Sequence, residues 1–225
     1  MNVAIIPSRR GSTGLFLKNM RVLGGKTLLQ RAIDIAKAAS FDRIVVVSDD
    51  HEAEKVAKVA EVQFVQEPES LADDESLEKA VVLAAKKSDI KPDHVCVLAP
   101  SSPLRSVDDV VGTRMLFKVG IQTTMTVTIE GDGMIPRLRN DRRNIYHASP
   151  WFALNWRART DRAVINEAAI WVDAQYLLET GHLIGPKIAV LEIPKWRAIE
   201  IRDYWDMMSA EAYFSELKKR GEIDG

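Results

Sequence analysis

The stretch VAIIPSRRGSTGLFLKN, residues 3–19, decides the fold. Its first five residues form a continuous apolar run, which is typical of a strand buried on both faces of a parallel sheet. Two arginines, a Gly-Ser-Thr-Gly turn and a Lys-Asn pair follow directly. Backbone amides that glycine frees between a strand and a helix form a natural anion site, and nearby cations strengthen it. We therefore expect residues 8–19 to form a loop that binds an anion such as phosphate.

The alternative interpretation of this loop is a surface turn whose basic side chains are solvated. The chain contains neither Gly-x-x-x-x-Gly-Lys-Ser/Thr nor Gly-x-Gly-x-x-Gly, the two common nucleotide motifs. Composition and periodicity therefore predict a phosphate-binding loop on an α/β sheet and nothing more specific.

Strands and helices alternate through the first half of the chain. Apolar runs typical of strands occur at residues 3–7, 42–50, 61–68 and 93–100. Helical spacing of apolar residues occurs at 27–40, 51–60, 73–90 and 107–120. This alternation predicts a three-layer α/β sandwich with a mixed, mainly parallel sheet and helices on both faces. Ligands bind such sheets beyond the carboxyl ends of the strands, which makes 7–19, 48–51 and 99–106 the candidate site loops.

The second half of the chain is less regular. Strand patterns are expected at 122–130, 164–173 and 187–194, and helices at 174–181 and 204–221. Residues 130–163 are rich in Arg, Asn and Trp and have weak periodicity. We interpret them as an arm or dimerisation excursion from a single domain that covers residues 1–225, since no repeat or Pro/Gly linker divides the chain.

The overall composition excludes several classes of protein. A net charge of −1 and a pI near 6.5 argue against a bulk nucleic-acid binder, which usually has a basic excess. The chain has no apolar run long enough to cross a bilayer and starts without a leader pattern, so we expect a soluble cytoplasmic protein with no membrane partner. The lone cysteine, Cys96, has apolar neighbours that favour a buried core residue. One of Asp49 and Asp50 is expected to cap the helix that follows them.

Seven motifs of the chain resemble, in their order, those of a known family. They are IIPSRRGSTGLFLKN, GGKTLLQRAI, VVVSDD, SLADDESLEKAVVLA, LAPSSPLRSVDDV, NEAAIWV and GPKIAVLEIP. In this order they resemble the CMP-sialic acid synthetase (N-acylneuraminate cytidylyltransferase) family, over nearly the whole chain. The resemblance implies a nucleotide-diphospho-sugar transferase-like fold. It also implies an enzyme that joins CMP from CTP to an acidic 2-keto sugar, such as a sialic-acid-like nonulosonate, and releases pyrophosphate. Mg²⁺ as cofactor and a homodimer are implied as well.

The resemblance also assigns roles to individual residues. Arg9 and Lys18 are expected to be catalytic through the triphosphate that they hold. The expected nucleotide-binding residues are Arg9, Arg10, Ser12, Lys18, Asn19 and Ser76. The expected sugar-binding residues are Ser101, Ser102, Arg105 and Asn166. Glu200 is the expected Mg²⁺ ligand.

Several positions depart from the pattern of the family. Thr13 stands where the family has a lysine, which removes a charge from the triphosphate. Glu67 stands in place of an arginine near the nucleotide and would repel phosphate. Ala99 replaces a glutamine, and Glu167 replaces the glycine that follows the asparagine.

The metal site departs further. Two aspartates that lie one residue apart in the family correspond here to Glu200 and Arg202. Glu200 offers an oxygen to Mg²⁺, whereas Arg202 opposes a second metal or partly replaces it. Asp203 is adjacent to Arg202, so in a strand its side chain is expected to point to the other face of the sheet. A solvated strand end is the alternative interpretation.

Because of these departures, two other functions remain as alternatives. One is a catalytically altered relative that acts as a nucleotide- or sugar-binding subunit, because fold does not fix function. The other is a related nucleotide-sugar glycosyltransferase, although the chain places no Asp-x-Asp after a strand. The joint presence of Arg9, Ser12, Gly14, Lys18 and Asn19 favours the cytidylyltransferase.

Overall fold

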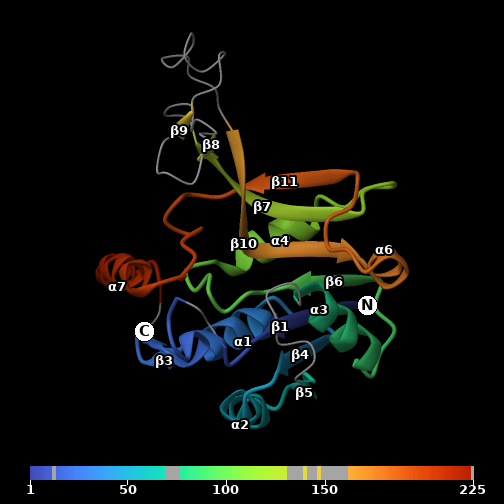
Figure 1. Cartoon of the computed structure of the whole chain (residues 1–225), viewed down its shortest axis with the longest axis horizontal. Helices are drawn as coiled ribbons and strands as arrows, with labels where there is room; N and C mark the ends of the chain where they lie inside the picture. Colours follow the sequence, from blue (N-terminus) through green and yellow to red (C-terminus); the bar gives the residue numbers. More distant parts are fainter. Residues whose placement is uncertain (12–13, 69–76, 131–138, 141–145, 148–161, 224–225) are drawn as a thin grey trace.

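A seven-stranded sheet forms the centre of the protein (Figure 1). The computed structural model describes all residues except 12–13, 69–76, 131–138, 141–145, 148–161 and 224–225. The strands lie in the order β11-β7-β10-β6-β1-β4-β5. Their bounds are β1 Asn2–Pro7, β4 Arg43–Ser48, β5 Gln63–Gln66, β6 His94–Val97, β7 Thr123–Glu130, β10 Arg162–Asp173 and β11 Ile188–Glu192.

The directions of the strands confirm the predicted mixed, mainly parallel sheet. β1 pairs in parallel with β4 and β6, β4 with β5, and β7 with β11. β10 runs antiparallel to both of its neighbours, β6 and β7. The carboxyl ends of β1, β4, β5 and β6 therefore meet at one edge, and the amino-terminal half of β10 reaches the same edge from the opposite direction.

Two short antiparallel pairs lie outside this sheet. β2 (Val22–Leu23) pairs with β3 (Lys26–Thr27), directly before the first long helix. β8 (Arg139–Asn140) pairs with β9 (Tyr146–His147) within the expected excursion 130–163, most of which lies outside the described residues.

Helices cover both faces of the sheet. They are α1 Leu28–Ala38, α2 His51–Val59, α3 Leu77–Lys87, α4 Val107–Arg114, α6 Ala174–Thr180 and α7 Tyr204–Lys219, with a 3-10 turn η1 at Lys18–Met20. α3 and α6 pack on one face, and α1, α2 and α4 pack on the other (Figure 1). Among the described helices, none has the combination of length and apolarity that a bilayer crossing requires.

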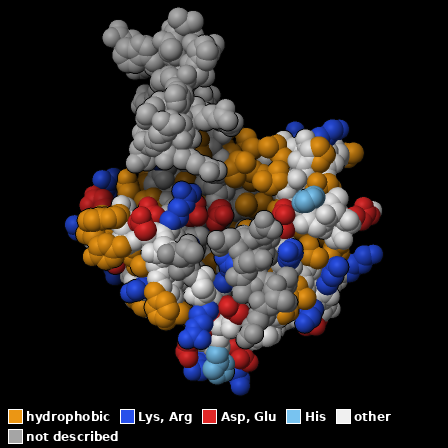
Figure 2. Space-filling view, viewed as in Figure 1, with side chains coloured by type: hydrophobic (Ala, Val, Ile, Leu, Met, Phe, Trp, Pro, Cys, Tyr) orange, Lys and Arg blue, Asp and Glu red, His pale blue; other side chains and the backbone are white. Residues whose placement is uncertain are grey.

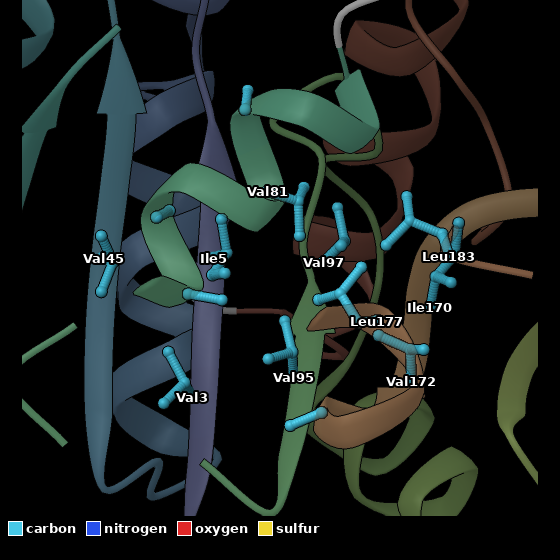
Figure 3. Close-up of a cluster of buried hydrophobic side chains, with 14 of the residues drawn as sticks. Val3, Ile5, Val45, Val81, Val95, Val97, Ile170, Val172, Leu177 and Leu183 are labelled. Atoms are coloured by element: carbon cyan, nitrogen blue, oxygen red, sulfur yellow. The ribbon is translucent and has the colours of Figure 1, made fainter. Parts of the chain in front are cut away.

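The alternation of side chains along the strands supplies both cores. Figure 3 shows Ile5 of β1, Val97 of β6 and Ile170 of β10 directed toward Val81 of α3 and Leu177 of α6. The intervening residues of the same strands face α1, α2 and α4, and the buried Cys96 is one of them, as predicted. Burying each large aliphatic side chain contributes roughly 1.5–3 kcal/mol, so this double core holds the strand ends in fixed positions.

Capping fixes where the helices begin. Asp50 caps α2 as predicted, because its carboxylate accepts a hydrogen bond from the Glu52 amide at 3.1 Å. α4 begins with a capping box between Ser106 and Asp109.

The expectation of a strand over Glu200–Asp203 is wrong. β11 ends at Glu192, and the chain then runs as a loop to α7. Asp203 is the N-cap of α7, where it forms a capping box with Asp206. This local hydrogen bonding competes with extended pairing and commits the segment to a helix start.

Candidate functional site

A cavity of about 250 Å³ lies beyond the carboxyl ends of β1 and β6, where the topology places ligands. We call it the strand-end cavity. Arg9 and Lys18 supply its cations, and Glu67 and Glu167 supply its anions. Four charged side chains, from the loop after β1, the end of β5 and β10, surround one hollow and make it the best candidate for an active site among the described residues.

The opening loop is fastened to the end of β4. The Ser8 amide donates to the Val47 carbonyl at 2.9 Å, and the Ser48 hydroxyl donates to the Ser8 carbonyl. The Arg10 amide donates to Asp49 Oδ1 at 2.7 Å. These bonds extend the parallel pairing beyond the strands and hold Arg9 at the cavity.

Lys18 and Asn19 enter the cavity from the turn η1. Leu17, which precedes η1, has φ of 50°, so the chain reverses sharply at this point. Asn19 is buried and donates to the Arg9 carbonyl at 3.4 Å. The two ends of the loop are thereby joined, with Arg9 and Lys18 on the same cavity.

Two other loops close against this one. A Cβ atom at Gly14 would collide with the Arg202 carbonyl oxygen, so only glycine allows the approach. The Ile201 amide donates to the Ser101 carbonyl at 2.7 Å. Loops 8–19, 99–105 and 199–203, far apart in sequence, therefore meet at one edge of the sheet.

Arg105 braces the loop that follows β6. Its side chain is 4% exposed, and its guanidinium donates to the Ser102 and Ala99 carbonyls. Burial lowers the pKa of Arg105 to about 10, although Glu167 and Asp109 oppose the shift. The group stays charged at neutral pH and adds positive potential behind the cavity.

A bulge in β10 places two neighbouring residues on different cavities. Between Ile165 and Ile170, β10 advances five residues while β7 advances only two, from Val127 to Met125. The three additional residues change the direction in which the neighbouring side chains point, as bulges near active sites do.

Asn166 holds this bulge in place. Its Oδ1 accepts from Thr126 Oγ1 at 2.6 Å and from the Ala168 amide at 3.2 Å. Thr126 Oγ1 also accepts from the Ala169 amide at 3.1 Å. Glu167 then lines the strand-end cavity, while Asn166 lines a second hollow.

The second hollow, of about 670 Å³, lies between β10, the loop 195–203 and α7; we call it the α7 cavity. Its charged residues are Lys195, Glu200, Arg202, Asp203 and Asp206, and its apolar surface includes Ile165 and Tyr213. Figure 2 shows acidic and basic side chains close together across the middle of the molecule, with hydrophobic side chains on either side.

Charged side chains of the two cavities influence one another. Arg202 Nη2 donates to Glu200 Oε2 at 2.5 Å, and this contact raises the pKa of Arg202. Burial and then the charge of Glu200 raise the pKa of Glu167, against the opposing effect of Lys18. A cation that arrived between these carboxylates would be favoured electrostatically.

The structure brings part of the predicted site together. The strand-end cavity is lined by Arg9, Lys18, Asn19 and Ser101. The α7 cavity is lined by Asn166 and Glu200.

Other predicted site residues are placed elsewhere. Ser102 and Arg105 are buried behind the floor of the strand-end cavity, and Arg10 is exposed beside it. Ser12 and Ser76 lie outside the described residues. The roles of all these residues stay predictions.

The sequence showed Glu67 and Glu167 as departures from the family pattern, with Glu67 near the nucleotide, but neither was predicted to be a binding residue. Glu67 directly follows β5, so the rule that ligands bind at strand ends was a usable signal for it. No local sequence pattern predicted the bulge that positions Glu167 at the strand-end cavity.

Over the described residues, no group of three or more His, Cys, Asp or Glu side chains forms a ready metal cage. Five carboxylates line the two cavities: Glu67 and Glu167 the strand-end cavity, and Glu200, Asp203 and Asp206 the α7 cavity.

Comparison with known proteins confirms the resemblance to the CMP-sialic acid synthetase family. Residues 3–110 match the family model described as cytidylyltransferase. The N-acylneuraminate cytidylyltransferase of Escherichia coli O18:K1:H7 (strain RS218 / NMEC) is 26% identical over 230 residues, which cover 99% of this chain and 54% of that protein. The pseudaminic acid cytidylyltransferase of Campylobacter jejuni subsp. jejuni serotype O:2 is 36% identical over 114 residues, which cover 48% of this chain and 49% of that protein. The chain thus spans about half the length of these curated relatives.

A solved structure supports the predicted fold. A CMP:2-keto-3-deoxy-manno-octonic acid synthetase complexed with CTP superposes with a TM-score of 0.65 at 15% identity, over 96% of this chain and 98% of that one. At this level of identity the likeness establishes a common nucleotidyltransferase fold and carries no detail of the substrate.

Proposed function

We propose that this chain, which matches the cytidylyltransferase family over residues 3–110, transfers CMP from CTP to an acidic 2-keto sugar of the nonulosonate type. The observation that carries the proposal is the meeting of Arg9, Lys18 and Asn19 on the strand-end cavity. Two cations at the carboxyl ends of parallel strands suit a triphosphate, because binding of this group depends more on fixed positive charge than on the shape of the cavity.

The reaction is a displacement at phosphorus. The anomeric oxygen of the sugar forms a bond to the α-phosphorus of CTP, and the bond from that phosphorus to the β-phosphate oxygen breaks. Pyrophosphate leaves with the electron pair of that bond, and the proton of the sugar hydroxyl passes to water. Negative charge grows on the leaving group, so Arg9 and Lys18 stabilise the transition state more than the ground state.

The bulge in β10 suits a reaction between two bound molecules. Glu167 faces the strand-end cavity, and the adjacent Asn166 faces the α7 cavity. In the proposed arrangement, CTP occupies the strand-end cavity and the sugar approaches from the α7 side. On that side Lys195 and Arg202, which lie among Glu200, Asp203 and Asp206, are the cations that can meet a sugar carboxylate.

Mg²⁺ is part of the proposal. The donor set fits, because Mg²⁺ is usually bound by one or two carboxylates together with substrate phosphates and water. Glu200 and Glu167 would hold it, and Arg202, which is paired with Glu200, supplies a further fixed cation. When bound, the metal would neutralise charge on the triphosphate.

We also propose a cytoplasmic homodimer. The exposed apolar side chains Val164 and Ile165, where β10 emerges from the expected excursion, support a partner surface. A reaction that consumes CTP fits the compartment in which nucleotides are made. Analytical ultracentrifugation tests the dimer directly.

The test of function is release of pyrophosphate. The protein is incubated with CTP, Mg²⁺ and each of several nonulosonic acids, and pyrophosphate is measured together with the CMP-sugar. We expect stoichiometric release with at least one acid and none without sugar. Thermal stabilisation by CTP without turnover would favour a binding subunit instead, and transfer from a nucleotide-sugar without CTP use would favour a glycosyltransferase.

A further inference from the structure

Glu67 has an unusual position for a carboxyl group in a cavity that is proposed to bind a polyanion. It follows β5, and its amide donates to the Ser48 carbonyl at 2.8 Å, which fixes its backbone to the end of β4. The residue is 2% exposed, yet it lines the strand-end cavity. A carboxyl group in such a place is costly unless hydrogen-bond donors meet it.

One oxygen of this carboxyl lacks a donor. Glu67 Oε1 is buried, and no described residue donates a hydrogen bond to it. Unpaired buried polar atoms are uncommon, and each one calls for a physical explanation such as a functional role or a partner that arrives from outside the chain. The cavity beside Glu67 is the direction from which a donor can arrive.

The surrounding charges decide which part of a nucleotide fits beside Glu67. Burial and the charge of Asp49 raise the pKa of Glu67, while Arg9 opposes the shift. A phosphate group would add more negative charge to this carboxyl pair. The uncharged nucleoside carries only hydrogen-bond donors and acceptors, and donors are what Oε1 lacks.

We propose that Glu67 is a specificity residue that accepts a hydrogen bond from the nucleoside of CTP. This inference rests on the proposed function and adds the orientation of the ligand: triphosphate toward Lys18 and nucleoside toward Glu67. Cytidine has three kinds of donor, which are the cytosine amino group, the 2′-hydroxyl and the 3′-hydroxyl. All three provide the same chemistry, an N–H or O–H directed at a buried carboxyl oxygen.

A competing role for Glu67 is to position Arg9 through charge alone. The two roles separate in a pair of variants. Glu67→Gln removes the charge but keeps a carbonyl acceptor, whereas Glu67→Met removes both at similar length. Both variants remove the negative charge, so any effect through Arg9 is common to them. Only Glu67→Met also removes the hydrogen-bond acceptor.

The experiment measures dissociation constants by calorimetry with CTP, UTP, 2′-deoxyCTP and 3′-deoxyCTP, each with Mg²⁺. UTP lacks the amino donor, and each deoxy analogue lacks one hydroxyl. We expect the unmodified protein to bind one of the three analogues at least tenfold more weakly than CTP. In Glu67→Met, the ratio of the dissociation constants of that analogue and CTP should fall below threefold. In Glu67→Gln, the ratio should lie between that of Glu67→Met and that of the unmodified protein. The analogue concerned identifies the donor.

Glu54→Gln, an exposed carboxylate on α2 away from the cavity, is the matched control and should leave all ratios unchanged. Equal loss of affinity for every nucleotide in both Glu67 variants would overturn the inference, as would ratios in Glu67→Met that match the unmodified protein. Melting temperatures verify that the variants fold. If the unmodified protein binds none of the four nucleotides, the proposed function fails first and this inference fails with it.

Discussion

The two sides of the strand-end cavity are built in different ways. On one side, β1, β4 and β5 are parallel strands whose ends deliver Arg9 and Glu67 simply because the strands stop there. On the other side, Glu167 arrives through a bulge in β10, and the loop 199–203 is held by contacts with Gly14 and Ser101. The first side follows from sheet topology, and the second depends on a few specific tertiary contacts.

The largest expected effect comes from removing a cation on the parallel side. Lys18→Ala and Arg9→Ala should each reduce kcat/KM by about 2–4 kcal/mol of transition-state stabilisation, which is roughly 30- to 1,000-fold. The melting temperature should change little, since neither side chain belongs to the core. Lys58→Ala on the exposed face of α2 is the control for loss of a charge. Unchanged kinetics in both cavity variants would remove the phosphate role of the loop.

The next prediction concerns the contact that joins the two sides. Gly14→Ala forces a methyl group into the Arg202 carbonyl, so we expect a loss of about 1–3 kcal/mol in stability together with lower activity. A methyl at Gly11, on the same loop, would meet no atom of the described residues within 4 Å. Gly11→Ala should therefore leave the melting temperature unchanged or slightly raised. Equal melting temperatures for the two variants would show that the loops do not depend on each other.

The bulge side is tested by a pair of threonines on β7. Thr126→Val removes the hydroxyl that bonds Asn166 and the Ala169 amide, and should cost about 1–2 kcal/mol in the free energy of unfolding. Thr124 is equally buried, but its hydroxyl has no hydrogen-bond partner among the described residues. Thr124→Val should therefore be neutral or stabilising in urea unfolding. If both substitutions cost the same, the bulge is not held by Thr126.

The smallest expected effect is a pH-dependent one at Glu67. Its folded-state pKa is raised above the ordinary value of 4.5 by burial and by Asp49, with Arg9 in opposition. As the pH rises from 4.5 toward the raised pKa, the unfolded chain ionises first, so this residue makes folding less favourable in that window. Glu67→Gln should therefore melt higher than the unmodified protein at pH 7, and the difference should vanish near pH 4. A difference independent of pH would show that ionisation of Glu67 does not contribute.

The same contrast explains what could be predicted from sequence. Local apolar runs and helical spacing predicted the central sheet and its mainly parallel character, and the Asp49-Asp50 pair predicted a helix cap, because these features depend on neighbours in the chain. Strand-end topology and motif order led to Arg9, Lys18 and Asn19. The loop 199–203 was misread as a strand, because the capping box at Asp203 was overlooked. The bulge at Asn166–Ala169 depends on Thr126, forty residues away in sequence, and no local pattern encodes that pairing.

The most direct test of the central claim is a crystal structure of the protein with CTP and Mg²⁺. The account predicts the triphosphate in the strand-end cavity against Arg9 and Lys18, with the nucleoside beside Glu67. A well-ordered nucleotide bound elsewhere, with this cavity filled only by solvent, would contradict it.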